Sequence, residues 1–160
     1  MARVTSLLLP EHGSSNRGRG TYMIQKTVDL TAQAISCGGG DIVECLTIPA
    51  NTKIISAGMQ VVLSATASAG TDATATLGTG ADDNEYVAAF DIDGATDGAY
   101  APAVTVLNDV VLTTSDTLDM TFAGTGTTFT AGKIRVFALL MDVSDVGDHA
   151  PTEVDRDTLA

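Results

Sequence analysis

The chain has 160 residues, of which 44% are hydrophobic, 4% are aromatic and none is Trp. This length suits one domain that buries roughly 70% of its unfolded surface in a single core. With so few aromatic residues, that core must consist of Val, Ile, Leu, Ala and Met. No stretch reaches the ~18 apolar residues of a membrane helix, and the apolar run Leu7–Leu9 is shorter than a secretory signal requires. We therefore expect synthesis in the cytoplasm, with no membrane partner.

The net charge of −12 is unevenly distributed along the chain. Residues 1–26 carry four basic side chains and one acidic side chain, whereas residues 27–160 carry four basic and nineteen acidic ones. Nucleic acid is a poor partner for so acidic a body, because carboxylates oppose the attraction of phosphates. The basic N-terminal segment predicts contact with an acidic neighbour, with simple solubilisation as the competing interpretation.

The first 20 residues predict an extended arm, because they are rich in Gly and Ser and lack any hydrophobic period. The residues of this arm expected to contact a partner are Arg3, Leu7, Leu8, Leu9, Arg17 and Arg19. From residue 21 onward, apolar and polar residues alternate between Gly-, Asp- and Thr-rich turns, which is typical of short strands. Eight strands are expected, at residues 22–30, 41–48, 53–65, 73–77, 85–92, 104–112, 117–122 and 133–143.

Three of these strands have patterns that predict which side chains face the core. Residues 41–48 place Ile42, Leu46 and Ile48 on one face, and residues 117–122 place Leu118, Met120 and Phe122 inward. In residues 53–65 the inward series is expected to be Ile55, Ala57, Met59, Val61 and Leu63. Gly58 interrupts that strand and is expected to mark a β-bulge. The segment 49–52 predicts a turn, with Pro ending the preceding strand and Asn at the corner.

The last strand, residues 133–143, is apolar on both faces, which indicates a central strand covered from both sides. Its apolar residues are Ile134, Val136, Phe137, Leu139, Leu140 and Met141. We expect an all-β protein, an antiparallel sandwich or jelly roll of about eight strands. The predicted organisation is an arm at residues 1–20, a body at 21–143 and an acidic C-terminal tail at 144–160.

The two cysteines, Cys37 and Cys45, flank a run of three glycines where the chain is able to reverse direction. A disulfide across the two resulting strands is geometrically feasible. Reduced thiols are the preferred interpretation for a protein made in a reducing cytoplasm. The spacing and the lack of a nearby His argue against zinc.

The best candidate for a metal site is the acidic stretch that contains Asp91, Asp93 and Asp97. Clustered carboxylates bind Ca²⁺, but the spacing departs from the EF-hand pattern, so turn-forming Asp residues on the surface are the preferred interpretation and no metal site is expected. His12 and His149 lie in the arm and the tail, without a framework for catalysis. No Gly-x-Ser-x-Gly sequence occurs. We expect no catalytic residue, no cofactor and no enzymatic activity.

The order of several segments resembles small virion structural proteins of tailed bacteriophages, of the capsid decoration (cement) type. These segments are IPANTKIISAG at 48–58, ATATLGTGADD at 73–83, FDID at 90–93 and AGKIRVFALLMDV at 131–143. The resemblance implies a β-sandwich body, a homotrimer, and a place on the virion surface in contact with the major capsid protein. The alternative is a receptor- or glycan-binding tip of a phage fibre or adhesin, which would use the acidic loops at residues 82–97.

Overall fold

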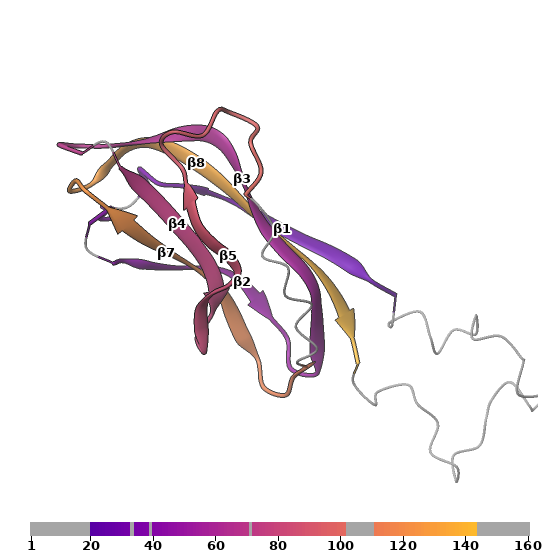
Figure 1. Cartoon of the computed structure of the whole chain (residues 1–160). Coiled ribbons are helices and arrows are strands. Elements are labelled where there is room, and N and C mark those ends of the chain that lie inside the picture. Colours follow the sequence, from indigo (N-terminus) through magenta and orange to yellow (C-terminus); the bar gives the residue numbers. More distant parts are fainter. Residues whose placement is uncertain (1–19, 33, 39, 71, 102–110, 144–160) are drawn as a thin grey trace, which may run out of the picture.

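The chain forms two antiparallel four-stranded sheets that pack face to face (Figure 1). The computed structural model describes residues 20–32, 34–38, 40–70, 72–101 and 111–143. The strands of this part are β1 (Tyr22–Asp29), β2 (Ile42–Ile48), β3 (Thr52–Ala67), β4 (Ala73–Thr79), β5 (Asp82–Asp91), β6 (Val111–Leu112), β7 (Asp116–Gly124) and β8 (Phe129–Asp142). The all-β expectation is confirmed, and no helix among these residues is long and apolar enough to cross a membrane.

The order of the strands decides between the two expected architectures. One sheet has the order β1-β8-β3-β6 and the other the order β2-β7-β4-β5. Thus β1 pairs with β8, β2 with β7, β3 with β6 and β4 with β5, all antiparallel. The chain is therefore one long nested hairpin whose successive strand pairs fall alternately in the two sheets. This is the jelly-roll topology.

The core lies between the sheets and is filled by alternating side chains from both of them. Leu118, Met120 and Phe122 of β7 are buried as expected. Across the interior, the rings of Phe122 and Phe129 meet edge to face with their centroids 5.2 Å apart. Burial of each large apolar side chain contributes about 1.5–3 kcal/mol to the free energy of folding. Strand β8 is central in its sheet, as its sequence predicted.

The prediction for β2 is wrong at its first residue, since Ile42 is 63% exposed while Leu46 and Ile48 are buried. The pairing of β2 with β7 shifts register between Glu44 and Leu46. The extra residue at this bulge, Cys45, reverses the alternation along the strand. Upstream of the bulge, Val43 rather than Ile42 is therefore the partly buried residue.

The prediction for β3 fails at both ends of its inward series for the same reason. Ile54 is buried in place of Ile55, and Leu63 is 41% exposed. Register shifts occur between Ile54 and Ser56 and again on both sides of Leu63. Gly58 lies at none of these shifts, so its expected bulge is absent. Instead it pairs with Phe137, and a Cβ atom at Gly58 would lie 2.8 Å from the Phe137 ring.

Other expectations have mixed outcomes. The turn before β3 is present, and Asn51 takes the left-handed conformation that this residue type tolerates, with φ of 55°. Of the strand expected at 104–112, the last two residues form β6, and the rest lies outside the described residues. The arm (1–19) and the acidic tail (144–160) also lie outside them.

The tight β4–β5 connection provides a test of the fold. A Cβ atom at Gly78 would overlap the carbonyl oxygen of Asp82, whereas at Gly80 the nearest atom, Asp116 Oδ1, would be 3.7 Å away. We expect Gly78→Ala to lower the free energy of unfolding by about 2 kcal/mol, because the backbone must move. Gly80→Ala is the matched control and should change it by about 0.5 kcal/mol or less. Urea unfolding of both variants measures the difference, and equal midpoints would contradict this packing.

Candidate interaction surfaces

The six apolar residues predicted on the last strand divide between its two faces. Ile134, Val136 and Leu140 are buried between the sheets. Phe137, Leu139 and Met141 are half-buried on the outer face of the β1-β8-β3-β6 sheet. A contact with another subunit can therefore involve only the second set.

Two residues that sequence reasoning missed extend this outer apolar surface. Met23 of β1 pairs directly with Leu139, and its side chain is 61% exposed. Tyr100 is 62% exposed and meets the Phe137 ring edge to face at 6.1 Å. We call the surface formed by Met23, Tyr100, Phe137, Leu139 and Met141 the apolar strip. The alternation of β1 places Met23 at an outward position, so its exposure could have been predicted from the sequence. Tyr100 reaches the apolar strip only through its long-range contact with Phe137, which the sequence pattern does not reveal.

The same outer face carries three of the four basic residues of the acidic body. Lys53 pairs with Met141 in the ladder. Lys133 forms an ion pair with Asp29 at 3.3 Å, and Arg135 Nη1 donates a hydrogen bond to Gln60 Oε1 at 3.1 Å. The apolar strip is thus flanked by positive charge on a protein that is otherwise strongly acidic.

The outer face of the β2-β7-β4-β5 sheet has the opposite character. Thr76 and Thr121 face each other across β4 and β7, and Asp119 follows on the same face of β7. The Oγ1 atoms of both threonines and Oδ1 of Asp119 are buried without a hydrogen-bond partner. Asp119 and Thr121 also line a cleft of about 360 Å³ beside the β4–β5 turn, together with Asp82 and Asp83. This face is polar and acidic.

The three carboxylates considered as weak calcium candidates are engaged in local hydrogen bonds. Asp91 Oδ1 accepts from the Gly94 N–H at 2.7 Å, and Asp93 Oδ1 accepts from the Ala73 N–H at 3.0 Å. Asp97 Oδ1 accepts from the Ser64 N–H at 2.8 Å, which fixes the loop against β3. The Gly94 N–H, followed by the Asp93 side chain, lowers the pKa of Asp91. Within the described ranges, no three His, Cys, Asp or Glu side chains gather as a metal site.

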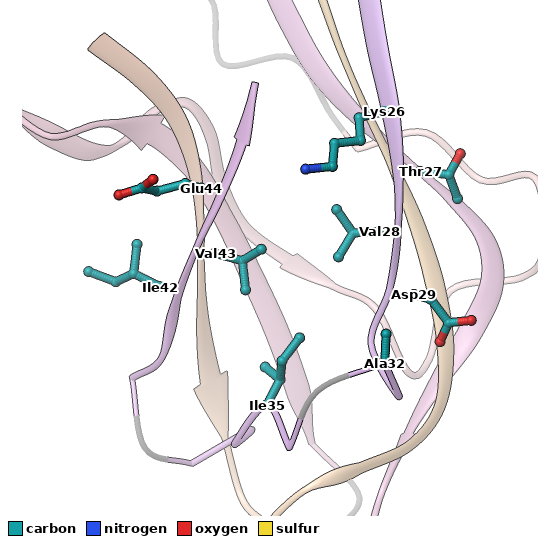
Figure 2. Close-up of a pocket in the computed structure, with 9 residues that line it drawn as sticks. All are labelled: Lys26, Thr27, Val28, Asp29, Ala32, Ile35, Ile42, Val43 and Glu44. Atoms are coloured by element: carbon teal, nitrogen blue, oxygen red, sulfur yellow. The ribbon is translucent and has the colours of Figure 1, made fainter. Parts of the chain in front are cut away.

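A third surface is a groove between the edge strands β1 and β2, with a volume of about 560 Å³ (Figure 2). Figure 2 shows Lys26 and Val28 pointing from β1 toward β2 and Val43 pointing from β2 toward β1, with Ile35 below them. Leu46 and the cysteine thiols lie deeper in the core. The inside of the groove is therefore apolar with a lysine at its mouth, and its lining also includes the polar residues Thr27, Asp29 and Glu44. Alternation along the chain does not reveal this groove, because the groove depends on two strands of different sheets.

The arm residues predicted to bind a partner, Arg3, Leu7–Leu9, Arg17 and Arg19, lie outside the described residues, as do both histidines. Their role stays a prediction.

The comparisons with known proteins identify the fold. No family model matches the sequence, and no curated protein does. A chain in the cyanophage Pam1 capsid asymmetric unit has a TM-score of 0.65 at 19% identity, with 88% of this chain and 94% of that chain covered. A chain in the capsid of Ralstonia phage GP4 has a TM-score of 0.58 at 20% identity, with coverages of 78% and 86%.

A chain in the acidic stable capsid of Helicobacter pylori bacteriophage KHP30 is also similar, with a TM-score of 0.54 at 10% identity and coverages of 78% and 89%. At these low identities the likeness establishes a shared fold. The likeness extends over 78–88% of this chain and 86–94% of the similar chains, so the fold is shared over most of both.

The two cysteines are free thiols, and both are buried. The Cys37 Sγ donates to the Asp72 carbonyl oxygen at 3.7 Å, and the Cys45 Sγ donates to the Val43 carbonyl oxygen at 3.2 Å. Burial raises the pKa of Cys45 to about 11, and burial followed by the charge of Asp93 raises that of Cys37. These thiols are protonated packing residues at neutral pH.

Their titration predicts a loss of stability in alkali. The pKa of Cys45 is higher in the folded chain than its ordinary value of 9.0. Its contribution to the free energy of unfolding is therefore complete below pH 9 and is lost as the pH rises toward 11. We expect a thiol reagent at pH 8 to label neither cysteine in the folded protein and both after unfolding in urea. The Cys45→Ala variant, which lacks this thiol, should show a shallower decline of unfolding free energy between pH 9 and 11. Rapid labelling of the folded protein at pH 8 would contradict the burial.

Proposed function

We propose that this protein is a structural component of a tailed-bacteriophage virion, which decorates the outside of the capsid and stabilises it by bridging capsid subunits as an oligomer. The observation that carries the proposal is the shared fold with chains of three phage capsid structures, over 78–88% of this chain and 86–94% of those chains. Its proposed partners are the major capsid protein and further copies of itself as a homotrimer. Its proposed place is the virion surface, after synthesis in the host cytoplasm.

The distribution of side chains supports a binding role rather than a reaction. The inward positions of the sheets are occupied by packing residues, and the candidate carboxylates hold loops in place. The apolar strip and its flanking basic residues suit a partner surface that is apolar with an acidic rim. We assign the outer face of the β1-β8-β3-β6 sheet to the contact with the shell and the acidic opposite face to the solvent.

The energetic requirement for such a contact is modest. A standard interface buries about 800 Å² on each partner, which at ~25 cal/mol per Å² gives a gross apolar contribution of up to ~20 kcal/mol. Association entropy and ordering of the arm offset much of this value. In this proposal the arm adds contacts through Leu7–Leu9 and through Arg3, Arg17 and Arg19. Even a small net gain, repeated over many copies, would stabilise a shell against the pressure of packaged DNA.

A receptor- or glycan-binding tip is the second candidate, and one observation favours it. The cleft beside the β4–β5 turn contains carboxylates and the unpaired Asp119 Oδ1 and Thr121 Oγ1 atoms, which are groups that bind sugar hydroxyls. The number of copies in each virion distinguishes the two functions. Decoration requires hundreds of copies, and a fibre tip requires at most a few dozen.

Virions with and without this protein test the main proposal. We expect quantitative mass spectrometry of purified virions to find hundreds of copies. Shells that lack the protein should release their DNA at a lower temperature and after milder osmotic shock, and added protein should restore both. Absence from virions, or equal resistance of the two kinds of shell, would overturn the decoration role.

A pair of substitutions tests the face that we assign to the shell. Met23→Asp places a charge on the apolar strip, and we expect it to weaken binding to shells by about tenfold or more, because a carboxylate must be desolvated or excluded. Thr47→Asp is the control, since Thr47 is exposed on β2 of the opposite sheet and lies outside the groove between β1 and β2. Co-sedimentation with shells measures binding. Equal binding by both variants would reject this face.

A further inference from the structure

Two edges of the jelly roll lie side by side and are open. Among the described residues β1 pairs only with β8, and β2 pairs only with β7. By contrast, the free edge of β3 is covered by the loop after β5, through hydrogen bonds such as that from the Val61 N–H to the Ala99 carbonyl oxygen at 2.8 Å. Natural sheets usually cover or block such edges. The apolar groove between β1 and β2 is therefore a place for one more strand.

Lys26 gives this groove a chemical preference. Its side chain points into the groove beside Val28 (Figure 2), and in the described part of the chain it has neither an ion-pair nor a hydrogen-bond partner. An extended segment that fits here needs an apolar residue opposite Val28 and an acidic residue opposite Lys26, two positions apart.

We propose that the groove binds residues 7–11 of the N-terminal arm of a second copy of this chain, as a strand antiparallel to β1. In this register Leu9 lies opposite Val28 and Glu11 lies opposite Lys26. Leu7, at the next inward position, extends toward the end of the groove where Ile35 lies. The proposal rests on the role of the arm as a tether in the proposed function, but it does not depend on the shell.

The sequence of the arm selects both the segment and its direction. Glu11 is the only acidic residue among residues 1–20, and two leucines precede it with the same alternation. Lys26 precedes Val28 in β1, whereas Glu11 follows Leu9 in the arm, so both pairs match only when the strands run in opposite directions. Pro10 then faces away from the groove on an edge strand, where proline is tolerated.

The residues between this segment and β1 favour a second copy over the chain's own arm. A continuous hairpin of the arm with its own β1 in this register would place residues 12–15 in a strand opposite β1, and Gly13 is of a type depleted in strands. The Gly- and Ser-rich composition of residues 12–20 is instead that of a linker. Extended at ~3.3 Å per residue, it spans up to about 30 Å, which is enough to reach an adjacent subunit. Arm-to-groove contacts of this kind are head-to-tail, and they close into a ring such as the proposed homotrimer when the rotation between subunits is that of the ring.

Charge reversal on the two sides of the contact tests the proposal with full-length protein. Glu11→Lys and Lys26→Glu should each weaken self-association by about tenfold or more, because two like charges then face each other. Thr47→Glu is the control, since Thr47 is exposed on β2, outside the set of residues that line the groove. When chains with E11K are mixed with chains with K26E, the arm of either variant meets a groove of opposite charge on the other variant, and a three-membered ring that contains both variants has two such contacts out of three. Sedimentation velocity and native mass spectrometry should then show mixed oligomers.

The mixture separates an exchanged arm from one that folds back on its own body. The exchange is supported if each variant alone is monomeric, and folded by circular dichroism, while the mixture forms mixed oligomers. A mixture that stays monomeric would overturn the proposed exchange of arms. Undiminished association of either variant alone would also overturn it, and so would a wild-type protein that is monomeric at tens of micromolar. If wild-type protein that fails this test still binds shells, the proposed function stands and only the arm-to-groove contact is rejected.

Discussion

The packing of small aliphatic side chains between the two sheets is the constraint on which the rest of this structure depends. With no Trp and few other aromatic residues, the interior is filled by closely spaced Ala, Val, Ile, Leu and Met side chains, and one ring pair, Phe122 with Phe129, joins the two layers. The cavities and the large exposed apolar residues that the structure describes lie at the outer faces and edges of this packed interior. Every candidate function therefore lies on an outer face or at an edge.

The two outer faces differ because the central strands β8 and β7 carry different residues at their outward positions. In β8 the outward positions carry Phe137, Leu139 and Met141 as well as two basic residues, whereas in β7 they carry threonines and Asp119. A body with one apolar, basic face and one acidic, hydroxyl-bearing face has a preferred orientation on any larger assembly. This asymmetry is what the proposed decoration role requires, since one side must bind and the other must stay solvated.

Much of the fold was predictable from alternation alone, because each residue of a strand points to the side opposite its neighbour. The strand bounds at β1 and β2 agree with the prediction within one residue, and Leu118, Met120 and Phe122 are buried as expected, whereas β8 begins four residues before its expected start. The errors at Ile42 and Leu63 share one cause. A bulge reverses the alternation, and the position of a bulge depends on the partner strand rather than on the bulged strand itself.

The sequence by itself determined the all-β class, the number of strands, the central place of the last strand and the charge contrast between arm and body. The tertiary structure alone decided which strands became neighbours. It brought Met23 and Tyr100 to the same surface as Phe137, and it opened a groove between β1 and β2. The physical reason is that alternation acts between neighbouring residues along the chain, whereas surfaces are formed by residues that the nested pairing of distant strands brings together.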